Sequence, residues 1–227
     1  MFAGWLSRRH FIAAALAGCY ALPAAAAPAS PAPRTILVVG DSLSAEYGLK
    51  RGTGWVALLG KRLATQRIPA RVVNASISGD TTSGGRSRLP AIVAQHKPDV
   101  VVIELGGNDA LRGLPLALTE ENLAHMAETA QKGRAKVLLV GIQVPPNYGT
   151  DYANRFAGLY QSVSKSHKTA LVPFMLKGVA DGVDATRLFQ PDRIHPTEAA
   201  QPLILENIWP ELKKLLPAPV SAGIAGS

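Results

Sequence analysis

Hydrophobic positions follow two alternating patterns along the chain. Short β-branched runs, which predict strands, are separated by longer segments in which hydrophobic residues recur every three or four positions, as in helices. The run Val100–Ile103 is hydrophobic throughout, which indicates a strand buried on both faces of a helix-covered sheet. The pattern predicts an α/β fold, a flavodoxin-like three-layer α/β/α sandwich around a five-stranded parallel sheet of order 2-1-3-4-5. The expected strands span residues 36–39, 71–74, 100–103, 136–140 and 170–174.

The segments between these strands predict the covering helices. Thr119 is expected to cap one of them, and the last helix is expected to be interrupted or kinked near Pro202 and Pro210. The first helix begins near Trp55, and the others span about residues 84–96, 119–132, 151–167 and 197–216.

The N-terminal segment has a different composition from the rest of the chain. Arg8 and Arg9 precede an uncharged stretch at residues 11–27, which predicts an export signal at 1–26 and a Pro/Ala-rich linker at 27–34. The folded domain is then expected at 35–216, with a flexible tail at 217–227.

Two modes of processing fit this segment. The string Ser7–Ile12 resembles a twin-arginine signal, with cleavage before Ala27 and a mature protein free of the signal. Alternatively, Leu16–Cys19 resembles a bacterial lipoprotein box, in which Cys19 is lipidated and becomes the new N-terminus. Both alternatives place the domain outside the cytoplasm, in the periplasm or secreted.

Composition narrows the class of protein. The chain has 227 residues, 47% of them hydrophobic, which suffices for one core. A single Cys excludes a disulfide framework and Cys-rich zinc sites. Without the signal, the chain has 22 basic and 16 acidic residues, which gives it a positive net charge. Such a charge favours solubility or attraction to anionic lipid surfaces. No cluster interleaves aromatic with basic residues, so no nucleic-acid partner is expected.

Polar residues gather in the loops that follow the predicted strands. Because the carboxyl ends of parallel strands meet at one edge of the sheet, these loops converge there. The four strings are Gly40-Asp41-Ser42-Leu43-Ser44, Ser76-Ile77-Ser78-Gly79-Asp80, Glu104-Leu105-Gly106-Gly107-Asn108-Asp109 and Asp192-Arg193-Ile194-His195-Pro196.

A serine nucleophile with its base explains three of these residues. A serine hydroxyl is a poor nucleophile at neutral pH and needs an adjacent base, which in turn needs a partner to fix its tautomer. Ser42, His195 and Asp192 are expected to supply the three parts. Asp192 lies three residues before His195, so its carboxylate can fold back to Nδ1–H and leave Nε2 free for Ser42.

Together the four strings resemble the blocks of the GDSL, or SGNH, hydrolase family, over nearly all of residues 35–216. They are most similar to the bacterial thioesterase I/lysophospholipase/arylesterase branch. The resemblance implies a serine esterase that hydrolyses carboxylic esters and thioesters through an acyl-enzyme, as a monomer without metal or cofactor. It also implies an oxyanion hole made by the backbone N–H groups of Ser42 and Gly79 and the side-chain amide of Asn108.

Each of these residues has a plainer interpretation. Ser42 could cap a helix that follows it, because serine is a common capping residue. Gly79 could simply permit a tight turn, and Asn108 could be a loop cap. His195 has no second His or Cys at a metal-ligand spacing, so no metal site is expected. Asp41 is expected to be a structural hydrogen-bonding residue, and Arg193 stands where the branch usually has Gly.

Two further functions are compatible with the same sequence. A polysaccharide acetylesterase would use the same triad. A non-catalytic envelope-binding domain would fold normally without turning over esters, although all five catalytic positions hold competent residues.

Overall fold

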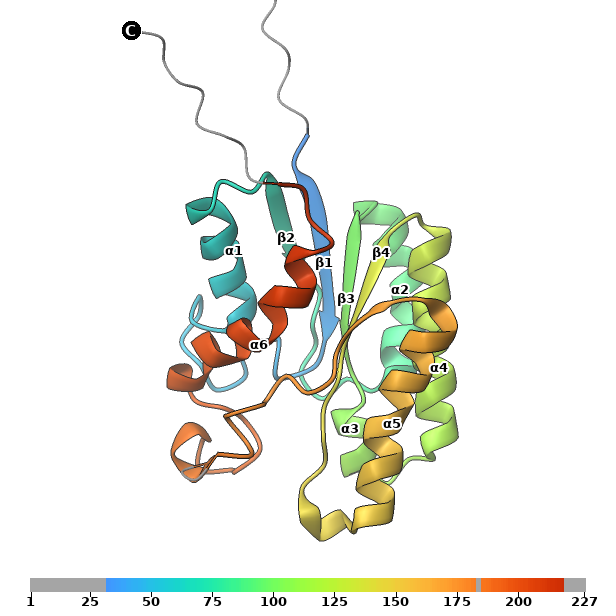
Figure 1. The fold of residues 1–227 in the computed structure, drawn as a ribbon, viewed down its shortest axis with the longest axis vertical. Helices are drawn as coiled ribbons and strands as arrows, with labels where there is room; N and C mark the ends of the chain where they lie inside the picture. The colour runs from blue at the N-terminus through green and yellow to red at the C-terminus, as the bar shows by residue number, and fades with distance from the viewer. Residues whose placement is uncertain (1–31, 183–184, 219–227) are drawn as a thin grey trace, which may run out of the picture. The chain divides into compact units, whose positions relative to one another are not determined.

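A sheet of five parallel strands forms the centre of the computed structural model, in the order β2-β1-β3-β4-β5 (Figure 1). The fold class and the strand order predicted from the sequence are therefore confirmed. The central strands β1 and β3 pair in register from Ile36 opposite Val100 to Gly40 opposite Glu104. The strands are β1 (Arg34–Gly40), β2 (Ala70–Asn74), β3 (Val100–Glu104), β4 (Lys136–Val140) and β5 (Ala170–Val172).

The structure describes residues 32–182 and 185–218. The predicted signal, the twin-arginine string and Cys19 lie outside these residues. Within them, no helix combines the length and the hydrophobicity that a membrane span needs.

Helices cover both faces of the sheet (Figure 1). The helices α1 (Trp55–Thr65) and α6 (Gln201–Lys213) pack on one face, and α2 (Thr82–His96), α4 (Leu116–Lys132) and α5 (Thr150–His167) on the other. In α1 the buried residues Trp55, Leu59 and Leu63 recur at helical spacing, which directs one stripe of the helix into the core. Their burial fixes the orientation of α1 on this face of the sheet.

Several boundaries differ from the sequence-based expectation. Thr119 does not cap α4, which begins at Leu116: the Thr119 side chain is buried inside the helix, 3.4 Å from the Asp109 carboxylate. The strand β5 ends at Val172, because Pro173 has no N–H to donate to the sheet. Arg34, expected in the linker, is already the first residue of β1.

The C-terminal helix is shorter than expected. A 3₁₀ turn at Glu198–Ala200 precedes α6, which ends at Lys213 instead of Leu216. Pro202 lies at its N-terminal end, where a missing N–H is tolerated, and Pro210 lies inside the helix without ending it.

The sequence also failed to predict a five-residue helix, α3 (Gly107–Leu111), directly after β3. We call the end of the sheet where the strands finish the carboxyl edge, and the opposite end the amino edge. The helix α3 places the third polar string, which contains Asn108, on a rigid turn at the carboxyl edge (Figure 1).

Candidate active site

Ser42 lies in a turn that directly follows β1, at the carboxyl edge. No helix begins there, since α1 starts only at Trp55, so the interpretation of Ser42 as a helix cap is wrong. The Ser42 hydroxyl is half-buried and its Oγ lies 2.9 Å from His195 Nε2.

His195 and Asp192 are brought to Ser42 by the loop before α6. The Asp192 carboxylate folds back within one turn, and its Oδ2 lies 2.7 Å from His195 Nδ1. Its Oδ1 accepts hydrogen bonds from the backbone N–H groups of Ile194 at 2.9 Å and His195 at 3.0 Å. These hydrogen bonds, from His195 first, lower the pKa of Asp192 to about 2, so its carboxylate stays ionised. The chain from Ser42 through His195 to Asp192 is therefore continuous.

The donors of the expected oxyanion hole are two backbone N–H groups and one side-chain amide. Within residues 32–182 and 185–218, neither the backbone N–H of Ser42 nor that of Gly79 donates a hydrogen bond. Gly79 adopts φ +78°, a left-handed conformation that favours glycine. Asn108, on the first turn of α3, adds its side-chain amide. All five residues expected from the sequence thus lie on loops or turns of one edge.

The buried Asp41 carboxylate orients the Asn108 amide. Asp41 Oδ2 accepts a hydrogen bond from Asn108 Nδ2 at 3.0 Å, and Oδ1 accepts one from Leu43 N at 3.0 Å. An amide nitrogen has two hydrogens, so one bond to Asp41 leaves the second for another acceptor. The expectation that Asp41 is a structural hydrogen-bonding residue agrees with this geometry.

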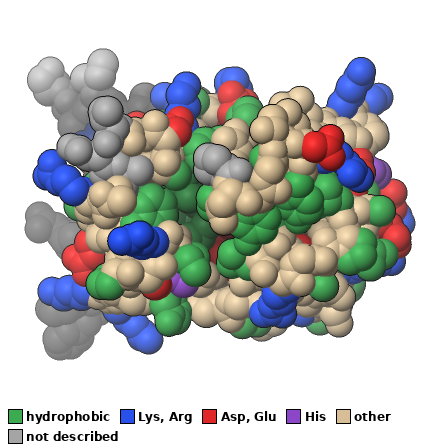
Figure 2. All heavy atoms as spheres, turned by 90° about the horizontal axis from the view of Figure 1, so that it is seen from below, with side chains coloured by type: hydrophobic (Ala, Val, Ile, Leu, Met, Phe, Trp, Pro, Cys, Tyr) green, Lys and Arg blue, Asp and Glu red, His purple; other side chains and the backbone are tan. Residues whose placement is uncertain are grey.

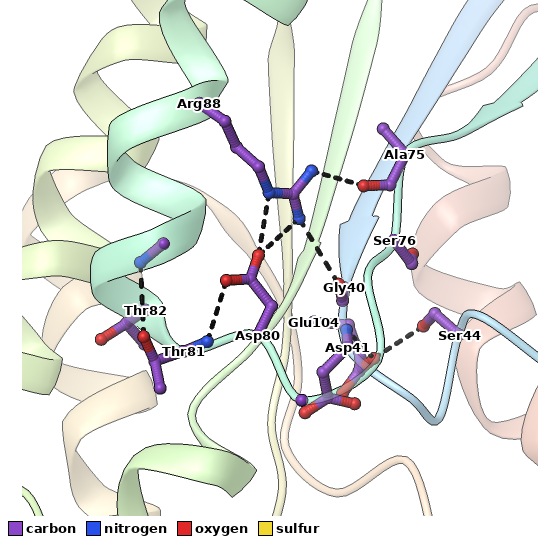
Figure 3. Close-up of polar contacts among 12 residues, drawn as sticks. Gly40, Asp41, Ser44, Ala75, Ser76, Asp80, Thr81, Thr82, Arg88 and Glu104 are labelled. Atoms are coloured by element: carbon purple, nitrogen blue, oxygen red, sulfur yellow. Dashed lines mark hydrogen bonds and ion pairs between the residues drawn. The ribbon is translucent and has the colours of Figure 1, made fainter. Parts of the chain in front are cut away.

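A fully buried glutamate contacts the turn at residues 42–48, which carries Ser42 and which we call the nucleophile turn (Figure 3). Glu104 Oε2 accepts a hydrogen bond from Ser44 Oγ at 2.6 Å, and Ser44 Oγ in turn accepts one from the Trp55 indole at 3.1 Å. Burial, together with the nearby Asp41 charge, raises the pKa of Glu104 well above 4.5, which favours its neutral form. This network fixes the turn that carries Ser42.

Arg88 connects the second loop to the end of β1 (Figure 3). Its guanidinium forms a fork with Asp80, at 2.8 Å through both Nε and Nη2, and it also donates to the carbonyl oxygens of Ala75 and Gly40. Both side chains are largely buried, so the pair holds the loop of Gly79 against the nucleophile turn.

The Tyr47 ring packs against the His195 ring, with the ring centroids 4.3 Å apart. Gln190 links the two loops, because its Nε2 donates to the carbonyl oxygens of Tyr47 at 2.9 Å and Pro196 at 3.2 Å. Sequence reasoning missed Tyr47 and Gln190, and it named Glu104 in a polar string without giving it a role. Tyr47 and Gln190 belong to no local motif. Glu104 lies at the end of a strand, and that position alone does not indicate which residues its side chain contacts.

The surface around the site is hydrophobic. All six large hydrophobic side chains that are exposed in the described chain lie at the carboxyl edge, on loops, on the first turn of α4 or α6, or at the end of the short helix α3. They are Tyr47, Ile77, Leu111, Leu118, Ile194 and Leu203. Figure 2 looks onto this edge and shows hydrophobic side chains gathered along a hollowed band. Such a surface suits an ester with a hydrophobic acyl chain.

Comparison with known proteins identifies the family. The profile of the GDSL-like lipase/acylhydrolase family matches residues 38–202. The chain belongs to this family. Among the described residues no group of His, Cys, Asp or Glu has a metal-binding arrangement.

Named relatives of this GDSL hydrolase are esterases and thioesterases. "Esterase TesA" of Pseudomonas aeruginosa is 57% identical over 88% of this chain and 98% of its own. "Thioesterase 1/protease 1/lysophospholipase L1" of Escherichia coli is 39% identical over 80% of this chain and 85% of its own. A crystal structure of TesA, 58% identical, has a TM-score of 0.78 over 81% of this chain and all of that one.

These similarities confirm the branch expected from the sequence. They support a serine ester hydrolase over a non-catalytic binding domain.

Replacing Asn108 with alanine is expected to lower kcat by about 10²–10³-fold, because it removes a donor for a developing oxyanion. The loss should appear in kcat more than in KM, since the ground-state carbonyl needs this donor less. The measurement is steady-state hydrolysis of p-nitrophenyl butyrate. Asn154→Ala, on the exposed surface of α5, serves as the control and should retain parent activity.

The Asp41→Asn variant is expected to change the pH dependence of stability. Burial raises the pKa of Asp41 from 3.8 to about 6 in the folded protein. A raised folded pKa contributes stability that is complete below 3.8 and is lost as the pH rises through about 6. The parent should therefore be more stable relative to Asp41→Asn at pH 4 than at pH 8, by urea unfolding. An equal difference at both pH values would contradict the assigned ionisation.

Proposed function

We propose that this GDSL hydrolase cleaves acyl esters and thioesters with Ser42 as nucleophile, His195 as general base and Asp192 as the partner of His195. The observation that carries the proposal is the continuous hydrogen-bond chain of 2.9 Å and 2.7 Å through these three residues. The names of the relatives, which include an arylesterase of Vibrio mimicus, support the same substrate class.

In the proposed mechanism, His195 Nε2 takes the proton of Ser42 as Oγ attacks the acyl carbonyl carbon. The carbonyl oxygen becomes an oxyanion, which the N–H groups of Ser42 and Gly79 and the Asn108 amide stabilise. His195 then gives the proton to the leaving alcohol or thiol, and an acyl-enzyme remains. Water, deprotonated by His195, hydrolyses the acyl-enzyme and regenerates Ser42.

The test is a series of p-nitrophenyl esters from acetyl to palmitoyl, with a matching acyl thioester. An optimum at medium or long chains, with thioester turnover, is the expected result, given the hydrophobic carboxyl edge. Activity confined to acetyl esters, together with release of acetate from an acetylated polysaccharide, would favour the acetylesterase alternative. Absence of turnover in a folded protein would overturn the proposal.

Export of this enzyme is part of the proposal. It is supported by Arg8 and Arg9 followed by the uncharged stretch at residues 11–27. Cell fractionation should find the enzyme in the periplasm or medium, and its intact mass identifies the processing. A mature chain that begins at Ala27 is the expected product; a lipidated chain that begins at Cys19 and sediments with membranes would establish the lipoprotein alternative.

The proposed enzyme acts as a monomer, because each residue of the proposed triad and oxyanion hole comes from one chain. Light scattering on the purified enzyme should give the mass of a single chain, and a dimer mass would contradict this.

A further inference from the structure

The positive charge of this protein is concentrated at the amino edge, opposite the candidate active site. Eleven exposed Lys and Arg side chains lie there, in the last turns of helices, in the following loops or at strand starts. Three carboxylates accompany them, those of Asp99, Glu128 and Glu211. The eleven are Arg34, Arg67, Arg71, Lys97, Lys132, Arg134, Lys136, Lys165, Lys168, Lys213 and Lys214.

This basic edge accounts for the whole formal net charge of +8, because the rest of the chain holds thirteen basic and thirteen acidic residues. The three carboxylates are already engaged: Asp99 with Arg34, Glu128 with Lys132 and Glu211 with Lys214. None of the other eight cations forms an ion pair with a carboxylate in the described part of the chain.

Helix dipoles explain only part of this pattern. Cations are favoured at helix C-termini, which accounts for Lys132, Lys165 and Lys213. Arg34, Arg71 and Lys136 instead lie at the starts of strands, outside the last turn of any described helix. The accumulation of charge therefore goes beyond the stabilisation of single helices.

The basic edge also contains a hollow of about 220 Å³. Arg34, Arg134 and Lys136 line it against one carboxylate, that of Asp99, with Leu215 and Pro217 on the remaining side. Neither Arg134 nor Lys136 is paired with a described carboxylate, and Lys136 Nζ lies 3.5 Å from the Leu215 carbonyl oxygen. The hollow thus has the charge and the size for a phosphate group.

We infer that the basic edge docks on an anionic phospholipid surface and holds the hydrolase there with its active site facing away. Charge complementarity carries the inference, and the course of the chain agrees with it. The described chain starts at Ala32, next to β1, and Pro217 lines the same hollow, so both of its ends lie at this edge (Figure 1). An attachment at the N-terminus would therefore bring this edge to the membrane.

Docking of this kind is electrostatic and involves no insertion. Among the described residues, the exposed large hydrophobic side chains all lie at the other end of the sheet. Binding should therefore weaken steeply as salt is added, because the Debye length falls to about 3 Å at 1 M. The inference does not depend on the proposed catalytic residues, so its failure leaves the proposed function unaffected.

The test compares two triple variants in the full chain. Arg71→Gln, Arg134→Gln and Lys136→Gln remove three cations from the basic edge. Lys50→Gln, Arg51→Gln and Lys177→Gln remove three exposed cations from the carboxyl edge and match the change in net charge. The seven residues of β1 separate the two edges by about 23 Å, more than twice the Debye length of about 8 Å at physiological salt.

Co-sedimentation uses vesicles of phosphatidylcholine, alone or mixed with an equal amount of phosphatidylglycerol. The parent should bind the anionic vesicles more strongly than the neutral ones, and added salt should remove this difference. Each cation near the surface is worth about fivefold in binding, so the basic-edge variant should bind the anionic vesicles roughly 100-fold more weakly. The control should change by less than about fivefold.

Turnover of a soluble p-nitrophenyl ester should be the same in the parent and in both variants. Equal losses of vesicle binding in the two variants would overturn the inference, as would equal binding of the parent to neutral and anionic vesicles. Stronger binding of the parent to a DNA oligonucleotide at the same salt concentration would also overturn it, in favour of a nucleic-acid surface.

Discussion

Replacing Ser42 with alanine is expected to lower kcat for p-nitrophenyl esters by about 10⁴–10⁶-fold. The Oγ atom is the only side-chain oxygen of the nucleophile turn within hydrogen-bond distance of His195 Nε2, at 2.9 Å. Without it, no acyl-enzyme forms, and the remaining rate comes from water attacking a carbonyl polarised by the oxyanion donors.

A neighbouring serine provides the control for this variant. Ser78 is exposed in the second loop, one residue before Gly79, and its hydroxyl makes no hydrogen bond in the described chain. Ser78→Ala should retain parent activity within a few-fold. Thermal unfolding of both variants should match that of the parent, because neither hydroxyl is fully buried. Loss of activity in Ser78→Ala, but not in Ser42→Ala, would show that Ser42 is not the nucleophile.

Asp192→Asn is expected to lower kcat by about 10⁴-fold while leaving the fold intact. In the parent, Oδ1 faces two backbone N–H groups and Oδ2 faces His195 Nδ1. An asparagine that keeps its oxygen on the backbone donors must point its NH₂ group at Nδ1. His195 then carries its proton on Nε2 and no longer accepts one from Ser42.

The pH profile distinguishes this effect from a loss of structure. The pKa of Asp192 is about 2, so its carboxylate is ionised throughout the assay range, and kcat/KM of the variant should lie below that of the parent at every pH in that range. The lowered pKa of Asp192 contributes stability that is present above 3.8 and is lost as the pH falls to about 2, and exposure of the side chain keeps this contribution small.

Asp151→Asn is the matched control, since it makes the same chemical change at an exposed position of the same edge. It should leave kcat unchanged. Retention of more than a tenth of the parent's kcat by Asp192→Asn would show that His195 is oriented by other groups.

The sequence predicted the sheet because each strand is a short hydrophobic run with a polar loop behind it. Ser42, Gly79, Asn108 and His195 follow four such runs, so a parallel sheet is enough to bring them to one edge. The helix α3 escaped prediction because five residues starting at Gly107 give no helical period. The residue type of Thr119 fits a helix cap, whereas burial against Asp109 keeps it inside α4.

The contacts that hold the site in place could not be predicted from the sequence, for another reason. Glu104 and Ser44 are 60 residues apart, and Gln190 and Tyr47 are 143 apart. Such pairs depend on the packing of loops, which no local pattern encodes. The Asn108–Asp41 bond, across 67 residues, belongs to the same class.

Ser42 and His195 are separated by 153 residues, so the first βα unit and the last loop complete the site together. During synthesis the ribosome releases the nucleophile turn long before the loop of His195. Under the proposed mechanism, a nascent or truncated chain that lacks this loop has no base for Ser42 and should be inert towards esters. Recovery of ester turnover during refolding should therefore follow the docking of the loop of His195, after the central strands have formed.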